Sequence, residues 1–150
     1  MKLRRQSITP HLTVSDIPKA AKFYEAAFGF SPKTMLPGRS GKIMHGQLTL
    51  ENGTMLMLGP ESEERGFRSP KTAGITSPVS LYLVVRDVDA QHQKAVAAGA
   101  RELLAPNDQF FGARTSLVLD PDGHQWMLSE EKEELSPEEL QAALKVTNAR

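Results

Sequence analysis

The chain has 150 residues, its 18 lysines and arginines balance its 18 aspartates and glutamates, and it contains no cysteine. This length suits one compact domain that buries its core without crosslinks. The balanced charge and the absence of a nucleic-acid-binding motif argue against DNA or RNA as a partner, and the missing thiols exclude disulfides, thiolate nucleophiles and thiolate metal sites. No long apolar run follows the basic first residues, so we expect no signal peptide, no membrane span and a cytoplasmic protein.

The first predicted unit, residues 8–58, begins with a strand over 9–14 that leads into a helix. Asp16 is the expected N-cap, Pro18 lies in the first turn, where its missing N–H costs nothing, and Gly29 ends the helix. Apolar residues recur at the spacing of one helical face, namely Ile17, Ala20, Ala21, Tyr24, Ala27 and Phe28. Strand, cap and helix therefore follow each other directly.

Two further strands are predicted over 43–50 and 54–58. The tripeptide Glu51-Asn52-Gly53 joins them, and its Asn-Gly pair indicates a hairpin because both residues tolerate a positive φ. One more strand, around Thr34, is needed to complete the unit.

The same order of elements repeats about 70 residues later, over residues 78–130. A strand over 79–85 precedes a helix that Asp87 caps and Gly99 ends. Strands over 115–119 and 125–128 flank the turn Asp120-Pro121-Asp122-Gly123, and a further strand is expected around Leu103. The chain is therefore predicted to be a single domain made of two copies of one unit.

The connection over 59–77 is rich in proline, glycine, serine and charge, and it has no apolar periodicity. We predict that it is a mobile flap or crossover near the binding site. After the second unit, Ser136-Pro137-Glu138-Glu139 forms a capping box that begins a C-terminal helix over about 136–146.

Four segments within residues 8–135 resemble the vicinal oxygen chelate superfamily of glyoxalases, bleomycin resistance proteins and dioxygenases. They read HLTVSDIPKAAKFYEAAFGF, MHGQLTLENGTMLML, LYLVVRDVDAQHQKAVAAGA and DPDGHQWMLSEE, and FFGARTSLVLDPDGHQW followed by LSPEEL resembles the PhnB-like branch. The resemblance implies an α+β fold of two βαβββ modules whose mixed sheets form a cup. It also implies a small-molecule ligand, held in many members through a divalent metal, and a homodimer.

Side chains alternate across a strand, so the strand positions predict which residues face the helices and which face the cup. The set expected under the helices is Leu12, Val14, Leu48, Leu50, Leu83, Val85, Trp126 and Leu128. The set expected in the cup is Thr9, His11, Thr13, His45, Gln47, Thr49, Met55, Met57, Ser80, Tyr82, Ser116, Val118, Gln125 and Met127.

The resemblance places the four metal-ligand points of the superfamily on Thr9, Gln47, Ser80 and Met127. None of these is a histidine or an acid, and hydroxyl, amide and thioether groups are poor ligands for Zn²⁺, Ni²⁺ or Fe²⁺. We therefore expect no metal and no other cofactor. Neither the glyoxalase reaction nor ring cleavage by a dioxygenase is supported.

The expected ligand-binding residues are His11, His45, Gln47, Met57, Tyr82, Phe110, Arg114 and Met127. Arg114 would hold a carboxylate or phosphate, which favours a small anionic ligand, but a salt bridge to a loop acid such as Asp108 is an equal alternative. Phe110 can support a planar ligand or close the core. His124 is expected to bond within its own turn, and His92 to lie on the surface.

We interpret the chain as a metal-independent protein that binds a small molecule, such as an antibiotic or a metabolite. One alternative is a glyoxalase-like lyase or isomerase, with a shifted metal site at His11, His45 and Gln47 or with a histidine as general base. Another is a structural or partner-binding protein whose cup is filled by its own side chains.

Overall fold

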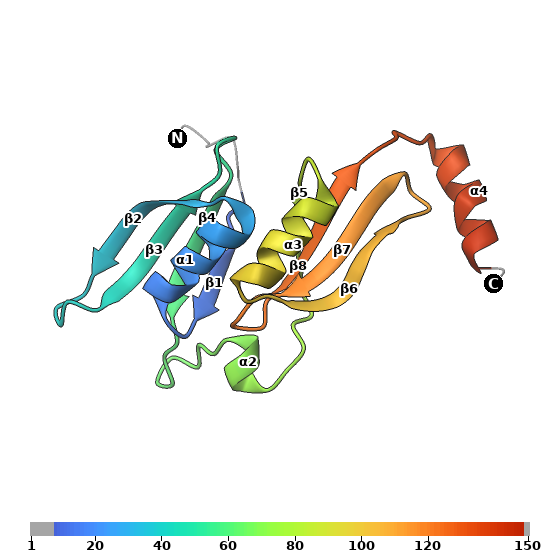
Figure 1. Cartoon of the computed structure of the whole chain (residues 1–150). Coiled ribbons are helices and arrows are strands. Elements are labelled where there is room, and N and C mark those ends of the chain that lie inside the picture. The colour runs from blue at the N-terminus through green and yellow to red at the C-terminus, as the bar shows by residue number, and fades with distance from the viewer. Residues whose placement is uncertain (1–7, 149–150) are drawn as a thin grey trace, which may run out of the picture.

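The computed structural model describes residues 8–148 and consists of two βαβββ modules, a short linker helix and a C-terminal helix (Figure 1). Module one contains β1 (His11–Val14), α1 (Ile17–Phe28), β2 (Ser31–Pro37), β3 (Ile43–Thr49) and β4 (Met55–Pro60). Module two contains β5 (Ser80–Val84), α3 (Val88–Ala98), β6 (Arg101–Asp108), β7 (Ala113–Leu119) and β8 (Gln125–Glu131). The remaining helices are α2 (Pro70–Ala73) and α4 (Pro137–Asn148).

The two sheets have the same topology, which confirms the predicted repeat. Their strand orders are β1-β4-β3-β2 and β5-β8-β7-β6. In each sheet the first and last strands of the module pair in parallel, and the other neighbours are antiparallel. The strands expected around Thr34 and Leu103 are β2 and β6.

Equivalent caps set the limits of the two long helices. Asp16 accepts a hydrogen bond from the Lys19 amide at 2.8 Å, and Asp87 accepts one from the Ala90 amide at 2.9 Å. Gly29 and Gly99 end these helices with φ of 79° and 116°, a conformation that glycine adopts without steric cost. The sequence predicts all four positions correctly.

A single core lies between the two sheets. Helix α1 packs on the first sheet and α3 on the second, and the two helices contact each other (Figure 1). Trp126 of β8 packs against Phe28 of α1 with ring centroids 4.6 Å apart and planes at 34°, so aromatic rings from both modules meet in this core. Both sheets therefore bury the same, helix-facing side.

We call the other side of each sheet its open face. Strand register gives the open face of sheet one as His11, Thr13, His45, Gln47, Thr49, Met55, Met57 and Gly59. The open face of sheet two is Ser80, Tyr82, Val84, Leu104, Thr115, Leu117, Leu119, Gln125, Met127 and Ser129. The shared core separates the two faces, so within one chain they do not meet.

The connection between the modules has local structure that the sequence analysis did not predict. Gly59 and Pro60 belong to β4, Ser62 and Phe67 form a β-bridge, and Pro70 is buried at the start of α2. The segment crosses from one module to the other (Figure 1), as a crossover should.

Helix α4 begins at the predicted capping box. The Glu139 amide donates to the Ser136 hydroxyl at 3.2 Å, and the Ser136 amide donates to the Glu139 carboxylate at 2.8 Å. None of the helices in the described part of the chain is long and apolar enough to cross a bilayer.

Candidate functional site

Two histidines face each other on the open face of sheet one, where side-chain alternation places them. The rings of His11 in β1 and His45 in β3 are stacked, with centroids 6.2 Å apart and planes at 23°. Gly59 lies on β4, the strand between β1 and β3, and a Cβ atom added to this glycine would be 2.6 Å from His11 Cε1. The absent side chain at Gly59 therefore leaves the space that the His11 imidazole occupies, and the sequence analysis did not single this glycine out.

Gln47 and Met57 are cross-strand neighbours on the same face, and Met57 is in turn the partner of His11. Gln47 Nε2 lies 3.2 Å from the Met55 sulfur, a weak acceptor. All four residues predicted from module one are thus brought together, and their binding of a ligand stays a prediction.

A hollow of about 810 Å³ lies between this face and the linker. His11 and Thr13 form one wall, and the linker forms the other with Pro60, Glu61, Ser62, Glu64, Arg65 and Phe67. The set of residues expected in the cup contains no carboxylate, but the linker brings Glu61 and Glu64 into this wall. That expectation was based on strand positions alone, and these acids come from the connection.

Glu61 also holds the linker in place. Its Oε1 accepts hydrogen bonds from the Ser69 amide at 3.0 Å and the Ser69 hydroxyl at 2.7 Å. Hydrogen bonds from Thr72 and Ser69 hold the pKa of Glu61 below its ordinary value, because they favour the ionised carboxylate.

Tyr82 and Met127 are cross-strand neighbours on the open face of sheet two. The Tyr82 hydroxyl is 2.6 Å from the hydroxyl of Ser129, which is buried, while the tyrosine as a whole is 52% exposed. The ring, rather than the hydroxyl, is the part of Tyr82 that is available to a ligand.

The predicted orientation of β7 is wrong by one residue. Ser116 and Val118 were expected in the cup, but they pair with Leu128 and Trp126 and are buried on the helix side. Thr115 and Leu117 lie on the open face instead. The β7 sequence ARTSLVL permits both alternations, and only its register with β8 decides between them.

Arg114 follows the same shift and does not line the predicted cup. Its Nε donates to Asp89 Oδ2 at 2.8 Å, its Nη2 to Asp89 Oδ1 at 3.1 Å, and its Nη1 to Asp108 at 3.2 Å. The expected anion clamp is therefore wrong, and the alternative salt bridge to Asp108 is confirmed. Hydrogen bonds from Arg114 hold the pKa of Asp89 below its ordinary value.

Phe110 lies at the tip of the β6–β7 hairpin and is 37% exposed. It packs edge to face on Phe111, with centroids 5.3 Å apart. It is neither a core residue nor part of the histidine pair.

The turn after β7 joins the two modules, which was not predicted. Asp120 accepts hydrogen bonds from Tyr24 Oη at 2.6 Å, from Trp126 Nε1 at 3.0 Å, and from two backbone amides of its own turn. Asp122 accepts from the Ser15 amide at 3.0 Å. The His124 amide donates to Asp120 within the turn, as predicted, while its ring Nε2 lies 2.8 Å from the Thr13 carbonyl of module one.

His92 also differs from its predicted place on the surface. It is 5% exposed, and its Nε2 is 2.6 Å from Glu102. It takes part in no open face.

The four inherited metal-ligand points are split between the modules. Thr9 and Gln47 belong to module one, and Ser80 and Met127 to module two. Among the described residues, one group of at least three acids or histidines is close enough to hold an ion, namely Asp87, Asp89 and Glu130. Each already has a role, because Asp87 caps α3, Asp89 binds Arg114, and Glu130 accepts from the Val88 amide at 3.1 Å.

Comparison with known proteins gives consistent matches. Residues 6–128 match the sequence model of the Glyoxalase/Bleomycin resistance protein/Dioxygenase superfamily. An uncharacterized protein of Mycobacterium tuberculosis is 37% identical over 140 residues, which cover 92% of this chain and 82% of the relative.

Two solved structures are similar in both fold and sequence. TioX from Micromonospora sp. ML1 is 27% identical, with a TM-score of 0.65 over 83% of this chain and 97% of TioX. TnmS3 from Streptomyces sp. CB03234, described as an antibiotic binding protein, is 25% identical, with a TM-score of 0.61 over 83% of this chain and 93% of TnmS3.

Proposed function

Because this chain belongs to the glyoxalase/bleomycin resistance protein/dioxygenase superfamily, we propose that it binds a small organic molecule on its open sheet faces without using a metal. The observation that carries the proposal is the pair of stacked imidazoles of His11 and His45 over Gly59, beside a hollow of about 810 Å³. A concave site with a few polar groups and apolar walls is the usual form of a small-molecule site. A cytoplasmic location stays a prediction from the sequence.

Similarity to TnmS3 favours an antibiotic or a comparable metabolite as the ligand class. The charged side chains around the hollow indicate the charge of this ligand. Two acids, Glu61 and Glu64, line the hollow together with one cation, Arg65. The hollow therefore suits a neutral or cationic ligand better than an anion, since Arg114, the expected partner of an anion, is occupied elsewhere.

The chemistry of the available donor groups disfavours a metal. The inherited ligand points supply two hydroxyls, an amide and a thioether, which bind transition metals poorly. The histidine pair is also oriented unfavourably, because a metal lies in the plane of each imidazole that binds it, about 2.0–2.1 Å from nitrogen. Stacked rings turn their faces to each other instead.

We further propose a homodimer in which the open face of sheet one in one copy meets that of sheet two in the other. Tyr82, Val84 and Leu104 are each more than half exposed on the second face, so residues 8–148 of one chain leave them uncovered. In such a dimer His11 and His45 of one copy would share a site with Tyr82 and Met127 of the second.

The test is a thermal-shift screen against antibiotics and metabolites, because a ligand that binds only the folded state raises the melting temperature. For each hit we expect His11→Ala and His45→Ala to weaken binding about tenfold or more. The control Gln93→Ala changes an exposed residue of α3 and should leave the affinity unchanged. Hits that tolerate both histidine substitutions would overturn the assignment.

The second candidate is a glyoxalase-like enzyme that uses His11 and His45 as shifted metal ligands or as a base. The proximity of the two rings is the observation that favours it. Metal analysis after purification without chelators separates the two functions. We expect no stoichiometric Zn, Ni, Fe or Mn, whereas near-unit occupancy that is lost in His11→Ala would support the enzyme.

A further inference from the structure

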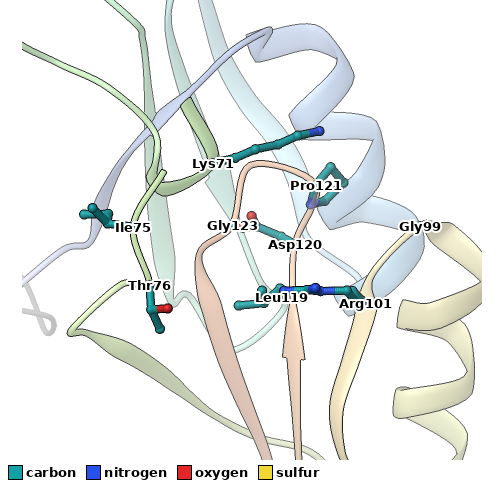
Figure 2. A pocket seen from close by; sticks show the side chains of 9 residues that line it. All are labelled: Lys71, Ile75, Thr76, Gly99, Arg101, Leu119, Asp120, Pro121 and Gly123. Atoms are coloured by element: carbon teal, nitrogen blue, oxygen red, sulfur yellow. The ribbon is translucent and has the colours of Figure 1, made fainter. Parts of the chain in front are cut away.

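A second pocket, remote in sequence from the histidine pair, lies where the linker meets the base of module two (Figure 2). Its volume is about 450 Å³, and it shares no lining residue with the hollow beside His11. The walls come from α2 and the residues that follow it, from the connection between α3 and β6 with the start of β6, and from the end of β7 with the β7–β8 turn. The residues that matter for its chemistry are Lys71, Thr76, Arg101, Leu119 and Pro121.

The charged groups available in this pocket are cations. In the described part of the chain, neither Arg101 nor Lys71 forms an ion pair, whereas Arg114 binds two acids. Asp120 also lines the pocket, but it is 4% exposed and its two oxygens already accept four hydrogen bonds. Asp120 is therefore committed to the joint between the modules.

The arrangement of the side chains suits an anion with an apolar body. Figure 2 shows the Arg101 side chain beside Leu119, its cross-strand partner, and the Lys71 side chain on the side of Pro121. Thr76 contributes a hydroxyl donor from the linker side. A guanidinium binds a carboxylate or phosphate with two parallel hydrogen bonds, and an exposed lysine is free to turn toward a bound charge.

We propose that this pocket is a binding site for a small organic anion, a carboxylate or a phosphate ester. Arg101 and Thr76 hold the charged end, Lys71 adds a second positive charge, and Leu119 and Pro121 contact the apolar part. The site bridges the linker and module two, so its ligand fixes the crossover in place. It shares Leu119 with the open face of sheet two, but it uses neither histidine of the site proposed above.

Arg101 also has a competing structural role. It lies two residues after Gly99, at the C-terminal end of α3, where the helix dipole favours a cation. If that were its only role, replacing Arg101 would lower stability and leave anion binding unchanged. The experiment has to separate these two effects.

The test is an NMR titration of the ¹⁵N-labelled protein with benzoate, phenyl phosphate and the neutral analogue benzamide, at constant ionic strength. We expect saturable shifts of the Thr76, Gly99 and Gly123 amides with both anions and none with benzamide. Comparison of the two anions shows which charged group is preferred. The amides of Gly46 and Gly59 in module one report binding elsewhere.

Arg101→Met should weaken anion binding about tenfold, and Lys71→Met should weaken it less, because an exposed lysine makes a looser contact. Arg86→Met, an exposed control outside the pocket, should bind like the wild type. The proposal is overturned if no saturable shift occurs, if benzamide shifts the same amides, or if Arg101→Met binds as tightly as the control. A lower melting temperature of Arg101→Met with unchanged affinity would assign Arg101 to the helix end.

Discussion

Asp120 links the two modules through one side chain from each. Its Oδ2 accepts from Tyr24 of α1 and from Trp126 of β8, and the tyrosine is almost fully buried. Burial and the nearby Asp120 raise the pKa of Tyr24 well above its ordinary value, so the phenol stays protonated and donates.

Asp120→Asn should lower the free energy of unfolding by about 3 kcal/mol, because an amide cannot accept all the hydrogen bonds that the carboxylate accepts. Tyr24→Phe should cost about 1–2 kcal/mol by removing one of them. Urea denaturation measures both. Asp16→Asn is the matched control, since asparagine caps a helix as well as aspartate. Equal stabilities of Asp120→Asn and Asp16→Asn would show that the buried carboxylate does not hold the modules together.

Arg114 gives a pH-dependent prediction. Its hydrogen bonds lower the pKa of Asp89 in the folded state, so the contribution of this pair is present above the unfolded pKa of about 3.9 and is lost as pH falls through the folded value. The melting temperature of Arg114→Met should therefore lie below that of the wild type at pH 7. The difference should shrink as the pH falls below about 4. If the difference is the same at pH 3 and pH 7, it comes from lost packing of the arginine stem.

At the scale of elements, the linker is a folded crossover with one exposed turn. Ser69 is the N-cap of α2, and its amide and hydroxyl both donate to Glu61, which lines the hollow beside His11. Residues 63–66 form the exposed turn between Ser62 and Phe67, the two residues of the β-bridge. Local opening of this segment should expose Arg65 and Arg68 to a protease before the sheets open.

Limited trypsin digestion should cleave first after Arg65 or Arg68. Ser69→Ala should speed this cleavage several-fold, because alanine removes both the N-cap of α2 and the hydroxyl that donates to Glu61. Ser40→Ala, in the exposed β2–β3 loop, is the control and should be cut like the wild type. Mass spectrometry identifies the first cut. A first cut outside residues 61–74, or equal rates for the two variants, would contradict the assigned role of Ser69.

Most of the elements could be predicted from the sequence. The helix caps, the hairpins and the repeat follow from local rules, and His11 and His45 follow from alternation within strands that have a clear apolar phase. The phase of β7 could not be predicted, because Ser116 and Leu117 are each compatible with either side of a sheet until β8 pairs with them. Glu61, Gly59 and the bond from His124 to Thr13 depend on contacts between segments far apart in the chain.

The two open faces determine how the whole molecule assembles. One core holds both helices and the inner sides of both sheets, so the outer side of sheet two exposes apolar side chains over β5 and β6. Apolar side chains exposed on a sheet face are typical of an interface. A second copy offers a complementary surface, the open face of sheet one, and a twofold arrangement would form two equivalent sites.

We therefore expect light scattering at micromolar concentration to give twice the chain mass of 16.5 kDa. Leu104→Glu places a charge on the open face of sheet two, where leucine is 56% exposed, and should shift the protein toward the monomer because the charge would be buried in the interface. Val96→Glu makes the same kind of change at a 42% exposed position of α3, outside the open faces, and should stay dimeric. Because the proposed site combines both faces, Leu104→Glu should also weaken any ligand that depends on His11 and His45. A wild-type monomer that binds such a ligand with full affinity would instead place the whole site within one chain.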